Sequence, residues 1–146
     1  MRRIGLLAAL GMALSCGPMD GADEQAAQLP FLIFSDARNN LTTDPGDTLV
    51  KIHYPVDCSS RTLAVSGLHL EIVAQGCHYS NAWNLSYALT IDRNRDGRFG
   101  PGDEVTVSEQ GRGDFDPNRA GAYRVRLFYG NCDPPQLLAI GDWHAE

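Results

Sequence analysis

The chain has 146 residues, of which 43% are hydrophobic and 21% charged, a composition typical of a folded globular protein that excludes an intrinsically disordered one. This length suffices for one domain with a sizeable core and leaves no room for a second domain of ordinary size. The formal net charge is −6, and removal of Arg2 and Arg3 with a leader segment would bring it to −8. Such acidity argues against nucleic acid as a partner, because nucleic-acid binding calls for a stripe of Lys and Arg.

The first residues combine a positive start with a short apolar run. Arg2 and Arg3 precede residues 4–14, IGLLAALGMAL, a run of 11 residues that is about half as long as a membrane-spanning helix. This pattern predicts a signal peptide over residues 1–15. The run ends in Ala13-Leu14-Ser15-Cys16, which resembles the lipobox of bacterial lipoproteins.

The lipobox resemblance implies a lipid anchor. Cys16 would become the mature N-terminus, with a diacylglycerol on its thiol and a further acyl chain on its amine, and stable anchoring requires more than one chain. By the same resemblance, Gly17 stands where an aspartate often retains such proteins in the inner membrane. We therefore expect an exported protein anchored in the outer membrane, facing the periplasm or the cell surface. The alternative is an ordinary signal-peptidase site after Ser15, which leaves Cys16 unmodified.

Residues 17–28, GPMDGADEQAAQ, are small, polar and unpatterned. They predict that residues 16–29 form the lipidated cysteine and a flexible linker to a domain over residues 30–146. Lipidation of Cys16 leaves three cysteines, an odd number, whereas four free cysteines allow two disulfides. Either way the compartment is oxidising, and we expect one disulfide. The preferred pair is Cys58 with Cys77, because a turn at Gly67 would fold the intervening strands into a hairpin, and Cys132 is a rival partner for either.

Seven stretches of the chain have the composition or the alternation of β-strands. The apolar phase changes at Ser66-Gly67, where we expect a bulge or a tight turn. Turn signals separate the stretches at short intervals, which favours an antiparallel β-sandwich of about seven strands. The predicted strands cover residues 31–34, 48–54, 62–74, 85–91, 104–108, 123–129 and 136–140.

Two of these stretches resemble a known class of sandwich. The motifs PGDTLV at residues 45–50 and AGAYRV at residues 120–125 look like the early and final strands of immunoglobulin-like domains on bacterial surface proteins. The resemblance implies an Ig-like β-sandwich preceded by the signal peptide and the linker.

The segment DRNRDGRFGPGDE, residues 92–104, has polar side chains at alternate positions and a further acid at its end. It resembles the calcium loop of EF-hands and, with Asp at the last position, of dockerins. The resemblance implies side-chain oxygens from Asp92, Asn94 and Asp96, the carbonyl of Arg98 and a closing carboxylate from Asp103 as ligands of Ca²⁺. Calcium takes six to eight such oxygens.

The flanks of this segment depart from the EF-hand. Alternating apolar residues before and after it predict strands where that family has helices, and the Asp103 side chain is shorter than the usual Glu. The interleaved Arg93, Arg95 and Arg98 are expected to point outward. The alternative interpretation is a hairpin loop whose Asp and Asn side chains accept hydrogen bonds from its own backbone.

The sequence contains no recognisable catalytic motif, so we expect a non-enzymatic protein, a membrane-anchored module for adhesion or envelope assembly with a protein or glycan partner. Two other interpretations remain open. One is a carbohydrate- or peptide-binding module that uses Tyr79, Trp83 and Tyr87, and the other is a small hydrolase whose site assembles from distant residues.

Overall fold

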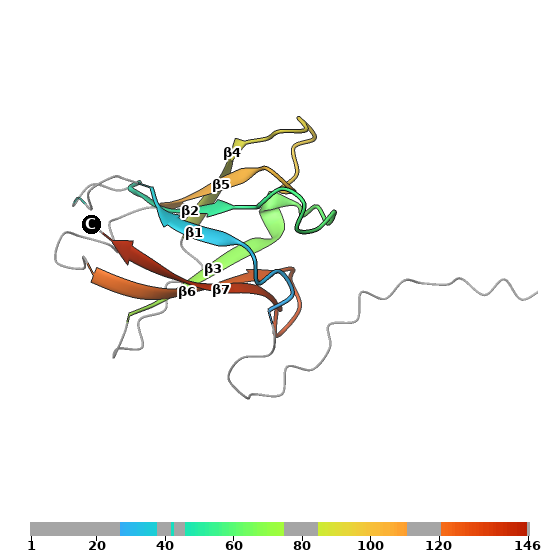
Figure 1. Ribbon diagram of the computed structural model, residues 1–146. Helices are drawn as coiled ribbons and strands as arrows, with labels where there is room; N and C mark the ends of the chain where they lie inside the picture. The colour runs from blue at the N-terminus through green and yellow to red at the C-terminus, as the bar shows by residue number, and fades with distance from the viewer. Residues whose placement is uncertain (1–26, 38–41, 43–45, 75–84, 111–120, 146) are drawn as a thin grey trace, which may run out of the picture.

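Two antiparallel β-sheets pack face to face in the computed structural model, which describes residues 27–37, 42, 46–74, 85–110 and 121–145 (Figure 1). The strands are β1 (Ile33–Asp36), β2 (Thr48–His53), β3 (Leu68–Ala74), β4 (Leu85–Ile91), β5 (Glu104–Glu109), β6 (Gly121–Tyr129) and β7 (Gln136–Ala145). The one helical element within the described ranges is the 3₁₀ turn η1 (Val65–Gly67). No helix in this part of the chain has the length and apolarity needed to cross a membrane.

The strand order confirms the predicted sandwich. One sheet has the order β1-β2-β5-β4 and the other the order β3-β6-β7, with every neighbouring pair antiparallel. If the strands are lettered in chain order, these are the ABED and CFG sheets of the constant-type immunoglobulin topology. All seven predicted strands are present, although their bounds differ in places.

The core lies between the two sheets and follows from the alternation of side chains along each strand. Residues of even number in β3, Leu68, Leu70 and Ile72, have at most 1% of their surface exposed. They belong to the same core cluster as Val105 and Val107 of β5, which are fully buried. Burial of side chains of this size contributes about 1.5–3 kcal/mol each. This apolar layer holds the two sheets together.

Strand β7 extends five residues beyond its predicted end. Gly141 and Asp142 have the composition of a turn, yet both pair with β6, opposite Val125 and Arg124. The ring of Phe34 on β1 covers Gly141 so closely that no Cβ fits there. The absence of a side chain at Gly141 therefore lets β1 pack onto β7, and tertiary packing overrides the local preference of this segment.

The predicted break near Gly67 is present as the turn η1, but it does not produce a hairpin. Leu63, on its near side, forms a bridge with Phe99, while β3, on its far side, pairs with β6. The ring of Tyr129 packs against Gly67 and fills the space of a Cβ there. The segments before and after Gly67 thus pair with different parts of the chain, the β4–β5 loop and β6.

This arrangement makes the predicted Cys58–Cys77 disulfide wrong. Cys58 is exposed and its thiol is free. The physical reason is that the expected hairpin around Gly67 does not exist: Leu63 pairs with Phe99, and β3 pairs with β6. Cys132 is disulfide-bonded. Cys16 and Cys77 lie outside the described residues.

The chain enters the domain slightly earlier than predicted. Leu29, assigned to the linker by its sequence, is 4% exposed and its N–H donates to the carbonyl of Leu138 at 2.6 Å. Beside it, the Arg61 guanidinium donates to Gln28 at 2.9 Å and to Gln136 at 3.1 Å. The packed domain therefore includes Leu29. Arg61 also links Gln28 to Gln136, the first residue of β7.

Candidate metal site

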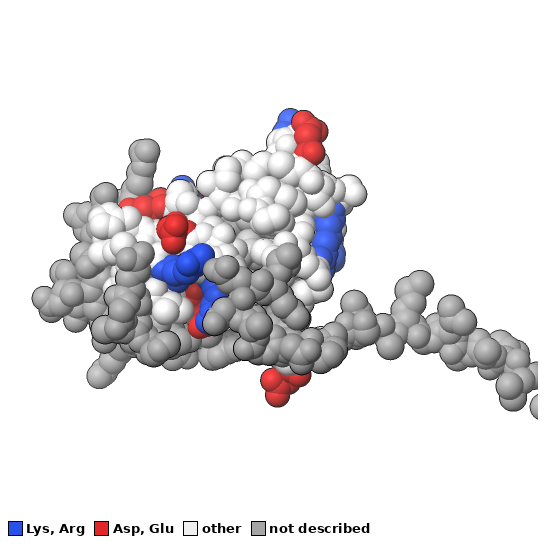
Figure 2. Space-filling model, turned by 60° about the horizontal axis from the view of Figure 1, so that its bottom comes forward, with Lys and Arg blue, Asp and Glu red and all other residues white. Residues whose placement is uncertain are grey.

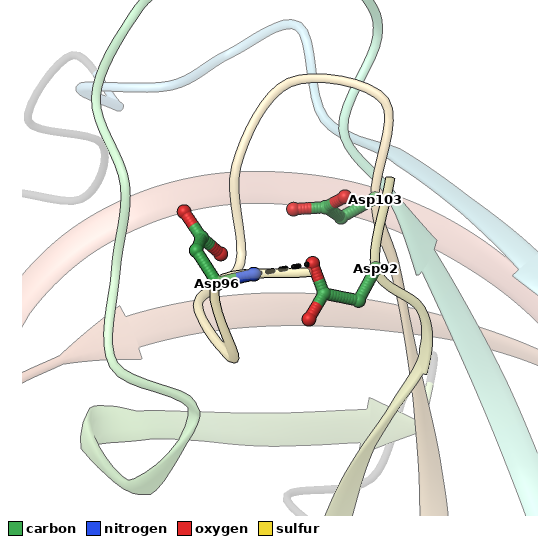
Figure 3. A group of neighbouring side chains, drawn as sticks. All are labelled: Asp92, Asp96 and Asp103. Carbon is green, nitrogen blue, oxygen red and sulfur yellow. Dashed lines mark hydrogen bonds between the residues drawn. The ribbon is translucent and has the colours of Figure 1, made fainter. Parts of the chain in front are cut away.

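Three aspartates converge in the loop that joins β4 to β5 (Figure 3). Asp92, Asp96 and Asp103 each offer a carboxylate oxygen, and these atoms all lie within 4.8 Å of one another. The loop is entered from one strand of an antiparallel pair and left by the other, as the alternating flanks predicted. It closes one end of the four-stranded sheet.

Asp103 is the buried member of this group, with 1% of its surface exposed. Its Oδ1 accepts the N–H of Arg93 at 2.7 Å and its Oδ2 accepts the N–H of Gly100 at 2.8 Å. Its backbone carbonyl accepts the N–H of Tyr54 at 3.0 Å, just beyond the end of β2. Asp103 therefore joins both halves of the loop to each other and to the neighbouring strand.

Asp92 and Asp96 are more exposed and organise the first turn of the loop. The Asp92 carboxylate accepts the N–H of Asp96 at 3.2 Å and that of Gly97 at 2.8 Å, while Asp96 accepts the N–H of Arg98 at 2.9 Å. Gly97 has φ +70°, a left-handed conformation in which a side chain is strained. Gly97 thus forms the sharp turn of the loop.

Phe99 anchors the middle of the loop in the core. Its N–H and C=O both bond to Leu63, each at 2.8 Å, and its side chain is fully buried with its ring 5.3 Å from that of Tyr54. The Arg98 guanidinium adds bonds to the hydroxyl and carbonyl of Thr62 at 3.1 and 3.3 Å. The segment between β2 and β3 thus forms a second wall of the site.

The structure brings together three of the five predicted ligands, Asp92, Asp96 and Asp103. Asn94 and Arg98 lie on the exposed part of the same loop, and the predicted outward placement of the arginines agrees with the exposure of Arg93, Arg95 and Arg98. Sequence reasoning missed the wall formed by Thr62 and Leu63, because no local spacing connects them to residues 36 positions further on.

A cluster made only of oxygen donors suits a hard cation such as Ca²⁺. The hydrogen bonds within the loop are those that the alternative interpretation requires, a hairpin stabilised by its own Asp side chains. The two interpretations are compatible, because a carboxylate oxygen that accepts one N–H keeps a second lone pair. The hydrogen bonds within the loop and the convergence of its carboxylate oxygens can therefore coexist.

A cleft of about 480 Å³ lies away from the loop, between η1, β3 and the start of β4. Leu68 and Leu85 line it together with the polar side chains of Ser66, His69 and Tyr87. Partial burial lowers the pKa of His69, and a side-chain hydrogen bond with Asn131 opposes this. Tyr79 and Trp83, on which the alternative of a carbohydrate- or peptide-binding module depends, lie outside the described residues.

The hydroxyl of Tyr87 accepts the N–H of Leu70 at 2.6 Å on the outer edge of β3. Burial raises the pKa of Tyr87 to about 12, and the backbone bond opposes this. Because the unfolded chain ionises this phenol near 10, we expect stability to be unaffected below pH 10 and to fall as pH rises toward 12.

Urea unfolding at several pH values in this window would measure the effect. Tyr87→Phe should have the flatter profile there, since the other tyrosines contribute equally to both proteins. Parallel profiles for the two proteins would contradict the prediction.

Comparison with known proteins adds no relative: no family model, no curated protein and no solved structure matches this chain.

Proposed function

We propose that the chain is a non-enzymatic, lipid-anchored Ig-like module of the bacterial envelope whose β4–β5 loop holds a structural Ca²⁺ ion. The observation that supports the ion is the convergence of Asp92, Asp96 and Asp103, with ligand oxygens within 4.8 Å of one another. The Asn94 side chain, the Arg98 carbonyl and a water near Gly100 would bring the coordination to the six or more oxygens that calcium takes.

The role of the ion would be to fix the loop rather than to switch it. The loop is joined to the core through Phe99 and to β2 through Asp103, so an ion held by Asp103 would tie the exposed turn at Asp96 to buried structure. Four acids, Asp92, Asp96, Asp103 and Glu104, stand among three arginines, a local charge of −1. This modest charge suits the weak sites of extracellular modules, with Kd of about 10⁻⁴–10⁻³ M.

The cysteines support the anchor. Because Cys58 is free, at most one disulfide can form among the remaining three cysteines of the chain. Lipidation of Cys16 would use the odd cysteine that this count leaves. A module held at the membrane by its N-terminus is suited to adhesion or to envelope assembly, with a protein or glycan as its partner.

Calcium is expected to raise the melting temperature of the wild type and to leave that of Asp96→Ala unchanged. Asp96 is the best position for the change because it is exposed, and its removal disturbs little of the fold in the absence of the ion. Calorimetric titration and thermal unfolding with calcium or with a chelator would measure both proteins.

Asp142→Ala is the matched control, because Asp142 is also an exposed acid but lies on β7. It should respond to calcium as the wild type does. An equal thermal response in wild type and Asp96→Ala would show that the loop does not hold the ion.

A further inference from the structure

The chain enters the sandwich at the end that carries the β4–β5 loop. At this end β2, β4 and β6 finish and β1, β3, β5 and β7 begin, and we call it the entry end (Figure 1). Gln28 and Leu29 are fixed there by Arg61 and by Leu138. Any anchor that precedes residue 27 therefore draws the entry end, and not the opposite end, toward the membrane.

The exposed large hydrophobic side chains of the described residues all lie at this end. They are Ile33 with 51% of its surface exposed, Val56 with 45% and Ile91 with 48%. Ile33 and Ile91 close a row across the four-stranded sheet, in which Ile33 pairs with His53, His53 with Glu104 and Glu104 with Ile91. Val56 lies beside Gly102 in the adjoining loop. They do not form one continuous patch, because His53 and Glu104 stand between Ile33 and Ile91, but all three lie at the end at which the chain enters the domain.

Exposed arginines accompany these side chains. Arg93, Arg95 and Arg98 project from the β4–β5 loop at the same end. Figure 2, in which the entry end lies on the right, shows basic side chains there next to acidic ones. The planar guanidinium group binds phosphate with two parallel hydrogen bonds, and it is more weakly hydrated than an ammonium. Apolar side chains next to arginines match the boundary between lipid tails and phosphate groups. Individual guanidinium groups would make the phosphate contacts, because the loop as a whole carries a charge of −1.

The distance to the anchor makes even a weak contact effective. Cys16 and Ala27 are 11 residues apart, which spans at most about 40 Å in any conformation. A surface held this close meets the bilayer at an effective concentration of about millimolar, so contact needs little intrinsic affinity.

We propose that the entry end rests on the lipid bilayer, with Ile33, Val56 and Ile91 in the interface and the loop arginines on lipid phosphates. The opposite end of the sandwich is then presented to partners. The proposal rests on the anchor at Cys16 in the proposed function, and it does not depend on the calcium ion.

Cys58 provides the probe for a test, because it is a free, exposed thiol two residues from Val56. The acylated protein is reconstituted into vesicles of phosphatidylethanolamine and phosphatidylglycerol, its intact mass is measured, and an environment-sensitive fluorophore is attached to Cys58 without reduction. Brominated lipids then quench fluorophores that lie in the interface. The control label is near the start of β6, at the opposite end of the sandwich, in Cys58→Ser/Ala122→Cys.

We expect several-fold stronger quenching at Cys58 than at the control position. Val56→Asp/Ile91→Asp should abolish the difference, whereas Ala88→Asp, an exposed site in the middle of β4, should retain it. Acylated protein with equal quenching at both positions would overturn the membrane contact alone. Absence of acyl mass on Cys16 would overturn the anchor and the contact together, and strong quenching without any calcium response would support the contact and remove only the ion.

Discussion

Phe99→Ala is expected to lower the free energy of unfolding by about 3–5 kcal/mol, the usual cost of removing a large aromatic side chain from a packed core. Phe99 is fully buried, and its ring lies in edge contact with that of Tyr54 at a centroid distance of 5.3 Å. Its backbone also forms the bridge to Leu63. The loss of the side chain would leave a cavity beneath the β4–β5 loop and loosen the loop as well as the core.

Urea unfolding, followed by the fluorescence of the tryptophans, would measure this loss. Trp143 is 3% exposed and stacks on Tyr123, so its emission should change on unfolding. Phe99→Leu, which keeps most of the volume, should cost less than about 1.5 kcal/mol. A loss no larger for Phe99→Ala than for Phe99→Leu would mean that the ring is not part of the core.

Asp103→Ala is the second large effect, a loss of about 3 kcal/mol in the presence of a chelator, because one buried and one partly buried N–H group would lose a charged acceptor. These donors belong to Arg93 and Gly100, and the side chain that serves them is 1% exposed. The loss should therefore appear without any ion. Calcium should then fail to stabilise the variant further, since the closing ligand is gone.

Asp96→Ala under the same chelating conditions is the control for this prediction. Asp96 is exposed and accepts one backbone N–H, from Arg98, so its removal should cost less than about 1 kcal/mol. Asp103→Asn should lie between the two, because it keeps one carbonyl oxygen as an acceptor. Equal chelated stability for Asp103→Ala and Asp96→Ala would show that Asp103 does not organise the loop.

The sequence predicted the strands well where one face of the strand is clearly apolar. The bounds of β4 agree residue for residue with the prediction, because alternation with a period of two indicates both the strand and its buried side. The spacing of Asp92, Asp96 and Asp103 also predicted their convergence, since the loop that holds them is local in the chain. Local patterns were therefore sufficient for β4 and for the convergence of the three aspartates.

The sequence failed where contacts join distant segments. Leu63 pairs with Phe99, so the residues before η1 do not pair with β3. The hairpin that was expected to bring Cys58 to Cys77 is therefore absent, and Cys58 is free. The burial of Leu29 depends on Leu138, more than a hundred positions away. The hydrophobic periodicity of the sequence does not predict such pairings, because each depends on how the two sheets stack against each other.

The two hydrogen bonds from the Arg61 guanidinium, to Gln28 and to Gln136, affect how the domain would respond to a pulling force. A force applied along the leading segment would reach these two bonds and the Leu29–Leu138 bond before it reached the strands. Beyond them comes β1, whose ladder with β2 is only four residues long. The first element to detach under tension would thus be β1, the shortest strand of the sandwich. Its detachment would lengthen the segment between the anchor and the domain while β2 to β7 kept their shape.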